Sequence, residues 1–535
     1  MTIDRLHSGT SGMFSVVAAL LLAVAPVTAQ QDYIGQANSL YDTIARANRS
    51  DLVLLPPLAD IEPAPEVVPN PRQAMLLPAG APGWDACVAW ATADTQQKII
   101  EALKTVTEDK DPRRGMAFGQ AYGQAAGFEA LSIGLYTDLG DPPLLAAANH
   151  LYLPYLDRLR VLVHVETTRL AADGSPVDAV YLLLDWVFFA RQMADRELFD
   201  EARWGYLAMI DALERIRDVV YEDSRLDRPL MSGSDLKGLL QWGESNRGAL
   251  DIARLNFPAA EVIAFDQLLS ITHIARGAPN PDTFAQTMAR LSSKDRPLQL
   301  FSATAQWQQA VENTADYFDM QDEGEGCLTD WADHRWRREW HDAFLKEPSH
   351  FQTLDPETFA MLSAIFVRQG EGGPVDFGVL QHDRQRVMTE VVGTRTAIAL
   401  RAYIEVHRQF PPVISALAPE YLPAIEADPY NPNRARGAQP PLEYFVPWTI
   451  NHRVPGPRDV NLPPHQINIV LGSGHNFRRL IGKDRFVLYS VGPNGGDEKA
   501  VDVQNASEFN PGDYLIWPPV LSLYRQYLSE QGQFE

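Results

Sequence analysis

The chain has 535 residues, a formal net charge of −23, 45% hydrophobic residues and 21% charged residues. These fractions are ordinary for a globular protein and exclude a disordered, collagen-like or multi-span membrane chain. The acidic balance argues against nucleic-acid binding, because proteins that follow phosphate backbones carry a basic excess. The length predicts roughly two to four domains.

The N-terminus is typical of an export signal. Arg5 and His7 lie in a short polar lead, Phe14 to Val24 is apolar, and small residues precede Gln30. The apolar run is too short to cross a bilayer as a mature helix, so we expect residues 1–29 to be a signal peptide cleaved after Ala29. An uncleaved anchor is the alternative. The expected localisation is extracytoplasmic, either periplasmic or secreted.

Two cysteines are present, Cys87 and Cys327. Outside the cytoplasm a disulfide between them would persist. Two unrelated buried thiols are the alternative, and the sequence does not separate the two.

Residues 30–83 predict a short helix followed by a linker. Tyr33 to Ala47 has a helical pattern, whereas prolines recur from 55 to 83. Proline disrupts helix interiors and central strands, so this second stretch is expected to connect rather than to pack.

Residues 84–389 predict an α-helical domain. Apolar residues recur at intervals of three and four, and Tyr181 to Tyr221 indicates two strong helices broken near Asp195 to Leu198. The most apolar stretch, Val180 to Phe189, carries Asp185 in its middle, which favours a buried core helix over a membrane span. We therefore expect no transmembrane span in the mature chain.

Four glycines in this region fall four residues apart, at Gly115, Gly119, Gly123 and Gly127. On a helix they would form a smooth stripe that lets another backbone approach closely. A ligand groove is the alternative interpretation of the stripe.

Residues 390–535 predict a small α+β module with an antiparallel sheet. A helix is expected from Thr394 to Arg408, with Ile398, Ala402 and Val406 facing the sheet. The expected strands are Gln466 to Leu471, Arg485 to Val491 and Tyr514 to Trp517. The predicted fold class is thus a mainly α helical array followed by a small α+β module.

The C-terminal region resembles a known family. The residues that carry the resemblance are Phe410-Pro411, Asp428-Pro429, Pro441-Leu442-Glu443-Tyr444, the string Tyr489-Ser490-Val491-Gly492-Pro493-Asn494-Gly495, and Trp517. They resemble the C-terminal module of large exported proteins of uncharacterised function from Planctomycetes-type bacteria. That module is similar to the globular head of the type II secretion major pseudopilins, in which a long helix packs on a small antiparallel sheet.

The chain departs from the pseudopilin pattern in two ways. The helix near residue 400 has no membrane segment before it, so we expect no pseudopilin-like filament. Residues 445–484 form an insertion of about forty residues relative to the resembling proteins, and Lys499-Ala500 stands where a pair of glycines is expected.

The loop after the Tyr-Ser segment is the nearest feature to a chemical site. Gly492, Gly495 and Gly496 permit positive φ. The oxygen donors that Ca²⁺ requires would come from Asp497, Glu498, Asp502 and Asp513. The resemblance implies a calcium site here, whereas Lys499 favours a solvated acidic turn.

Two further patterns suggest metal ligation less specifically. Asp319 to Asp330 partly fits a twelve-residue calcium loop, but its last position is not the usual glutamate. Asp330, His334 and His341 share a helix face, although Arg337 lies among them and would repel a cation.

No catalytic motif is present in the sequence. We therefore expect an exported, non-catalytic scaffold or binding protein of the cell envelope, whose partner is another protein or an envelope surface. The alternative is an extracytoplasmic hydrolase with its site in the helical domain. A cleft with converging carboxylates or histidines would favour the enzyme, and an exposed apolar or aromatic surface would favour the binding protein.

Overall fold

The computed structural model describes most of the chain, with several gaps. The described residues are 32–108, 115–123, 134–245, 258, 260–272, 283, 287, 377–431, 440–447, 465–471, 476–482, 485–503 and 512–534. The predicted signal peptide, Cys327, the loop from Asp319 to Asp330 and the two histidines beyond it all lie outside these residues.

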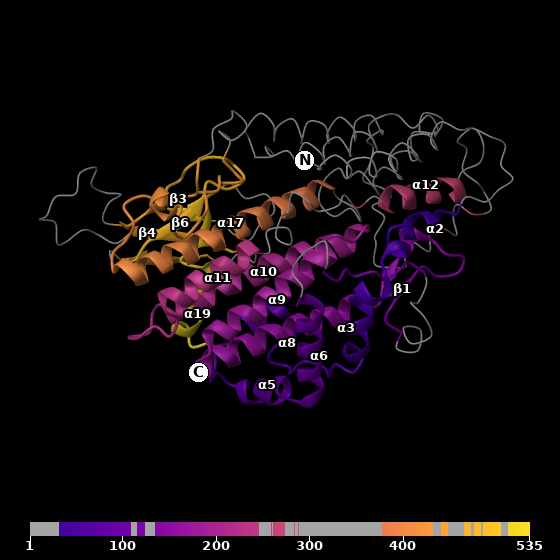
Figure 1. The fold of residues 1–535 in the computed structure, drawn as a ribbon, viewed down its shortest axis with the longest axis horizontal. Coiled ribbons are helices and arrows are strands. Elements are labelled where there is room, and N and C mark those ends of the chain that lie inside the picture. Colours follow the sequence, from indigo (N-terminus) through magenta and orange to yellow (C-terminus); the bar gives the residue numbers. More distant parts are fainter. Residues whose placement is uncertain are drawn as a thin grey trace, which may run out of the picture.

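Helices dominate the described residues before position 408 (Figure 1). The helices are α2 (Tyr33–Asn38), α3 (Asp51–Leu58), α4 (Pro71–Leu76), α5 (Trp84–Ala91), α6 (Asp94–Thr107), α8 (Leu153–Ala172), α9 (Pro176–Ala194), α10 (Phe199–Asp223), α11 (Gly233–Ser245), α12 (Ala260–Thr272), α17 (Phe377–His407) and α19 (Val520–Glu530). The predicted break in the long helical stretch is confirmed, because α9 ends at Ala194 and α10 begins at Phe199.

The centre of the array is the antiparallel pair α9 and α10, which packs against α8 and α17. Trp186 and Phe189 of α9 are fully buried, and the Asp185 carboxylate accepts a hydrogen bond of 2.9 Å from Thr107. The most apolar stretch is therefore a core helix, as predicted. Among the described residues, no helix combines the length and hydrophobicity that a membrane span requires.

The C-terminal strands form two small three-stranded sheets. The inner sheet has the order β3 (Glu443–Phe445), β6 (Val487–Ser490), β8 (Tyr514–Trp517), and all its pairs are antiparallel. The outer sheet has the order β5 (Asn476–Ile481), β4 (His465–Val470), β7 (Asp502–Val503), with β4 and β7 parallel. A two-stranded sheet of β1 (Thr137–Asp138) and β2 (Asn149–His150) lies within the helical part.

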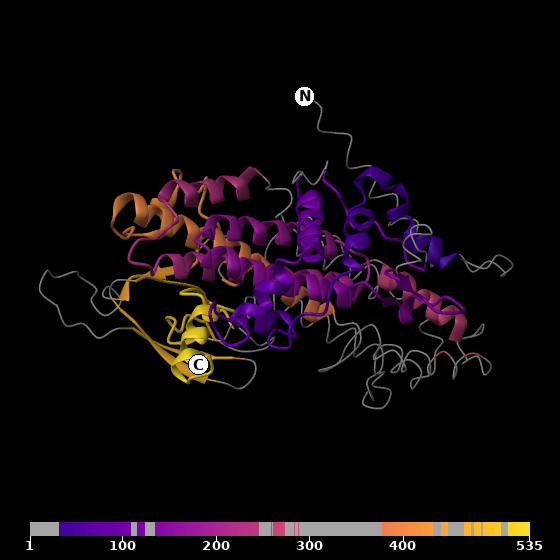
Figure 2. The same ribbon diagram turned by 90° about the horizontal axis from the view of Figure 1, so that it is seen from below.

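The inner sheet is apolar on both faces because it lies between two cores. Phe486 and Leu488 join the large helical core, whereas Val487 and Tyr489 join a smaller core beneath the outer sheet and α19. Figures 1 and 2 show the sheets at one end of the molecule and α2 with α12 at the other.

The helix from Thr394 is longer than predicted and belongs mainly to the helical array. α17 starts at Phe377 and packs on α10 and α11 as well as on β8 and β6. Ile398 and Ala402 are buried in the shared core, but Val406 is 48% exposed. The boundary expected at 389/390 falls inside this helix, because sheet and array share one core.

The expected proline linker is wrong for much of its length. Pro56 and Pro57 lie inside α3, where burial of Leu54, Leu55 and Leu58 offsets the hydrogen bonds that proline removes. α4 begins at Pro71, where no intrahelical N–H is needed. The predicted helix to Ala47 is also shorter, since α2 ends at Asn38 and 3₁₀ turns follow.

The predicted glycine helix is also wrong. Residues 115–123 are irregular, and Ala117 and Tyr122 form isolated β-bridges. The Gly119 N–H donates to Asp51 over 3.0 Å, and Gly123 has a φ of +67° that favours glycine. Gly127 lies outside the described residues.

Candidate functional site

The acidic loop between β6 and β8 is held by protein donors. The Tyr489 hydroxyl donates to Asp497 over 2.8 Å, and the Lys499 ammonium lies 3.1 Å from the other oxygen of the same carboxylate. Gly492 and Gly495 have the positive φ that the sequence indicated. Lys499 therefore neutralises Asp497, which is the arrangement expected of a solvated turn.

The other three predicted calcium ligands point to different partners. Asp513 is buried and accepts from the backbone N–H of Ala500 over 2.6 Å. Asp502 is exposed on the outer sheet and accepts from Asn468 over 2.8 Å. Glu498 accepts from the Asn494 amide over 2.9 Å. Within the described residues, no three His, Cys, Asp or Glu side chains gather as a metal site, so the geometry gives the calcium prediction no support.

Asp513 has an unusual electrostatic environment. Burial, and then the neighbouring Glu498 and Asp497 carboxylates, raise the pKa of Asp513 to about 8. The backbone N–H groups of Ala500 and Glu498 oppose this rise without cancelling it. A proton thus helps to keep these carboxyl groups close together at neutral pH.

Of the two cysteines, Cys87 lies within the described residues and Cys327 lies outside them. Cys87 is buried in α5 with no partner sulfur among the described residues, and burial raises the pKa of its thiol. A buried thiol of raised pKa is a weak nucleophile.

A buried polar cluster, which we call the Glu201 cluster, lies where α9 meets α10. Its members are Tyr41, Tyr122, His150, Tyr152, Arg196 and Glu201. Both Arg196 Nε, at 2.8 Å, and the Tyr152 hydroxyl donate to Glu201 Oε1. The Tyr122 hydroxyl donates to Oε2 over 2.9 Å.

The hydrogen bonds of the Glu201 cluster have a fixed direction. Because Tyr122 gives its only proton to Glu201, the Tyr41 hydroxyl, 3.0 Å away, must donate to Tyr122. Tyr41 in turn accepts from the backbone N–H of Glu197 over 3.1 Å. Each donor in this series of hydrogen bonds is therefore directed toward the Glu201 carboxylate.

The charges of the Glu201 cluster are compensated internally. Burial opposes ionisation of Glu201, but Arg196 and His150 hold its pKa below the ordinary value. Burial raises the pKa values of the Tyr122 and Tyr152 hydroxyls, which stay protonated. The Arg196 guanidinium also lies 4.0 Å from the ring centroid of Tyr41 and 4.7 Å from that of Tyr122.

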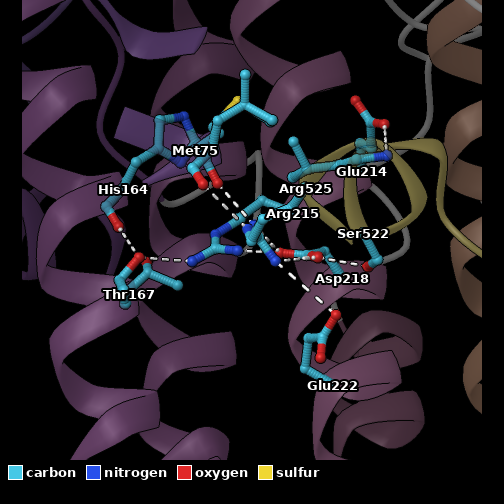
Figure 3. Close-up of polar contacts among 12 residues, drawn as sticks. Met75, His164, Thr167, Glu214, Arg215, Asp218, Glu222, Ser522 and Arg525 are labelled. Atoms are coloured by element: carbon cyan, nitrogen blue, oxygen red, sulfur yellow. Dashed lines mark hydrogen bonds and ion pairs between the residues drawn. The ribbon is translucent and has the colours of Figure 1, made fainter. Parts of the chain in front are cut away.

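A second cluster joins the C-terminal helix to the array (Figure 3). The Asp218 carboxylate on α10 accepts from Arg215, from both terminal nitrogens of Arg525 at 2.9 Å, and from Ser522 at 2.5 Å. Arg525 also donates to the backbone oxygens of Met75 and Leu76. Two guanidinium groups thus share one buried carboxylate.

A third cluster joins α10 to α17 and β8. Arg217 donates to Glu390 and to Thr394 (2.7 Å), and its Nε donates to the backbone oxygen of Ile516 over 3.1 Å. The Tyr514 hydroxyl donates to the second oxygen of Glu390. The three clusters therefore fix segments that lie far apart in the sequence.

The outer sheet presents a solvated face. Its inner side chains, Ile467, Ile469 and Phe477, are buried, whereas Gln466 and Arg478 on the other face are exposed. Leu480, on this exposed face, is 64% accessible, more than any other large hydrophobic residue that the structure describes. β5 pairs with β4 through six residues, and no described strand lies along its other edge.

Sequence reasoning missed the three buried clusters. Their members lie far apart in the sequence, by 307 positions for Asp218 and Arg525 and by 450 for Met75 and Arg525, so no local spacing reveals them. A weak signal exists in α10, where Arg215, Arg217 and Asp218 alternate with the buried apolar residues Ile216 and Val219. Charged residues at positions where the helical period requires burial indicate partners elsewhere in the chain.

Comparison of the chain with protein-family models, curated proteins and solved structures found no match. The pseudopilin-head resemblance therefore rests on the quoted residues alone.

Proposed function

We propose that the protein is an exported, non-catalytic scaffold of the cell envelope that binds another protein through its C-terminal sheet. The observation that carries the proposal is the exposed face of the outer sheet, where Leu480 lies beside Arg478 on the edge strand β5. Leu480 is a single exposed apolar side chain rather than an apolar patch, so the proposal depends on its place on an edge strand, whose unpaired backbone groups can pair with another chain. The predicted signal peptide supports an extracytoplasmic location.

The buried clusters support a scaffold role for the rest of the chain. Glu201, Asp218 and Glu390 each accept hydrogen bonds from an arginine and from at least one hydroxyl group. The hydrogen-bonding capacity of these carboxylates is therefore used by residues within the fold. Glu390 and Asp218 join β8 and α19 to the helical array, and rigid elements present binding side chains precisely.

The alternative, an extracytoplasmic hydrolase, has its nearest arrangement in the Glu201 cluster. There a carboxylate, three phenols and an imidazole converge. Tyr122, Tyr152 and Glu201 are fully buried, however, and a catalytic carboxylate must reach its substrate.

Photocrosslinking in the native host tests the proposed function. We would place p-benzoylphenylalanine at Leu480 and, as a control, at Leu226, which is 49% exposed on the loop after α10. A discrete adduct with another protein from position 480 alone, in a chain whose N-terminus starts at Gln30, is the expected result. A cytosolic chain with an intact N-terminus, or no adduct from position 480, would overturn the proposal.

A further inference from the structure

β5 has a free edge with side chains suited to pairing. It pairs in continuous register with β4 from Asn476 to Ile481, and its outer edge has no partner strand among the described residues. Unpaired backbone N–H and C=O groups on an edge strand form a template for another strand. Long edges of this kind are normally covered, shortened or charged.

The side chains beside this edge are basic and apolar. Arg478 points to the exposed face together with Leu480, while Arg479 points to the inner face. Arg479 donates to Glu530 over 2.8 Å through Nη1, and its guanidinium lies 5.6 Å from the ring centroid of Phe477. Its Nε and Nη2 have no hydrogen-bond partner among the described residues. Glu530 compensates Arg479, so Arg478 is the exposed cation that β5 offers to a partner, in a chain whose net charge is −23.

We propose that the outer edge of β5 binds an extended acidic segment of a partner protein as an added strand. This inference rests on the proposed binding function and names the chemistry of its partner. Main-chain hydrogen bonds along the edge would supply affinity, and alternate side chains would supply specificity. A carboxylate of the incoming strand would lie beside Arg478, and an apolar side chain would cover Leu480.

The same charges disfavour pairing with a second copy of the chain. An antiparallel β5–β5 contact would bring the Arg478–Arg479 pair opposite itself, and like charges directly opposite destabilise a sheet. Arginines on the edge thus act against self-association while favouring an acidic partner.

The test uses the purified full chain and synthetic peptides. The probe is a fluorescein-labelled octapeptide of alternating Val and Glu, followed by fluorescence anisotropy. We expect saturable binding that Arg478→Glu weakens by about tenfold or more, as the loss and reversal of one charge pair implies. The matched control is Arg408→Glu, since the Arg408 side chain, just after the end of α17 at His407, is 77% exposed.

Two control peptides separate strand addition from charge attraction. Replacing each Val by proline keeps every Glu and removes half of the main-chain N–H donors. Replacing each Glu by Lys reverses the charge. Neither peptide should bind. Infrared spectra with a ¹³C-labelled peptide carbonyl should show the β-sheet amide I band on binding. Because Arg478 and Leu480 are exposed, variants at these positions should melt like the wild type.

Several outcomes would overturn the inference. They are equal binding of the proline peptide, equal binding by Arg478→Glu, or no binding of the Val-Glu peptide. If a crosslink forms from position 480 and any of these results is also found, the proposed binding function stands, but the inference that an acidic strand is added to β5 is wrong.

Discussion

Arg525 on α19 donates two hydrogen bonds of 2.9 Å to the carboxylate of Asp218 on α10, 307 positions earlier in the chain. Arg215 contacts the same carboxylate from within α10. Burial and the nearby Arg525 charge lower the pKa of Arg215, which shows how closely the two cations approach. Asp218 is thus the anion that holds both guanidinium groups and the C-terminal helix in place.

The first prediction compares the two sides of this contact. Asp218→Ala should cost about 3–5 kcal/mol of folding free energy, because it leaves two buried cations without their anion. Arg525→Met should cost less, because Arg215 and Asp218 stay paired and the repulsion between the arginines disappears. Urea unfolding at pH 7 measures both. Arg408→Met, at an exposed site, should change stability by no more than about 0.5 kcal/mol. Equal losses in the two cluster variants would contradict this account.

The second prediction concerns the Glu201 cluster. Glu201→Gln should destabilise the fold by about 3–5 kcal/mol, since Arg196 is then left buried without its counter-ion. Tyr152→Phe removes one donor only and should cost about 1 kcal/mol. Adding Arg196→Met to Glu201→Gln should recover part of the loss, because the unpaired charge is gone. A double variant less stable than Glu201→Gln alone would show that the unpaired Arg196 charge is not the main cause of the stability lost in Glu201→Gln.

The third prediction uses two glycines in helices. A Cβ at Gly205 of α10 would lie 2.8 Å from the backbone oxygen of Ala190 and 2.7 Å from Ala194 Cα. Gly205→Ala should therefore separate α9 from α10 and lower the thermal midpoint. Gly238 of α11 has open space around it, so Gly238→Ala should gain up to about 1 kcal/mol from helix propensity. The opposite signs of the two midpoint shifts check the close packing of α9 on α10.

The elements that sequence predicted well are those with strong periodic patterns. The strand at Tyr514–Trp517 matches its prediction, and β6 lies within the predicted Arg485 to Val491. The break between α9 and α10 was visible because charged residues interrupt two apolar helices. In these elements the residues that the periodic pattern marks as apolar are also the ones that the fold buries, so the pattern predicts the element correctly.

The missed features depend on contacts between distant segments. The buried leucines of α3 compensate for Pro56 and Pro57, and nothing within that helix indicates it. The glycine spacing at 115–123 has a helical period, but Gly119 instead contributes an N–H to Asp51. The candidate calcium ligands were grouped by sequence proximity, whereas strand alternation turns Asp502 away from Asp513. Local spacing cannot report these relationships.

The fourth prediction concerns Asp513. Its pKa is 3.8 in the absence of perturbation and about 8 in the fold, so the folded state binds more protons between these values. This contribution to stability is complete below pH 3.8 and is lost as the pH rises through 8. Glu498→Gln removes a neighbouring negative charge, lowers the folded pKa of Asp513 and should reduce the alkaline loss. Unfolding midpoints from pH 5 to 9 measure it. Asp502→Asn, on the opposite sheet face, should keep the wild-type profile.

The last prediction concerns His164 of α8, which lies beside the second cluster, in which Arg215 and Arg525 share the Asp218 carboxylate (Figure 3). The side chain is fully buried, and neither ring nitrogen has a hydrogen-bond partner among the described residues. Burial lowers the pKa of His164 to about 3; Asp211 opposes the shift, and Arg160, Arg215 and Arg72 reinforce it. The imidazole is therefore neutral in the folded protein.

The pH dependence of His164 follows from this shift. Between about 3 and the ordinary value of 6.5, the unfolded chain binds a proton that the folded chain does not. Stability is therefore complete above pH 6.5 and falls as the pH decreases, by about 1.4 kcal/mol per pH unit well below 6.5. His164→Leu removes this term and also removes a buried polar group without a partner. The variant should be at least as stable as the wild type at pH 7.5, with a clearly larger advantage at pH 5.

His164→Gln is the matched control, because it cannot titrate but keeps a polar side chain. It should show the same reduced acid sensitivity as His164→Leu, from a lower stability at pH 7.5. Burial also lowers the pKa of His382 to about 3, so the difference between variant and wild type is the quantity to compare rather than the wild-type slope. If His164→Leu and the wild type lose stability in parallel between pH 7.5 and 5, then His164 is already partnered and its neutrality is not what limits the acid stability of the fold.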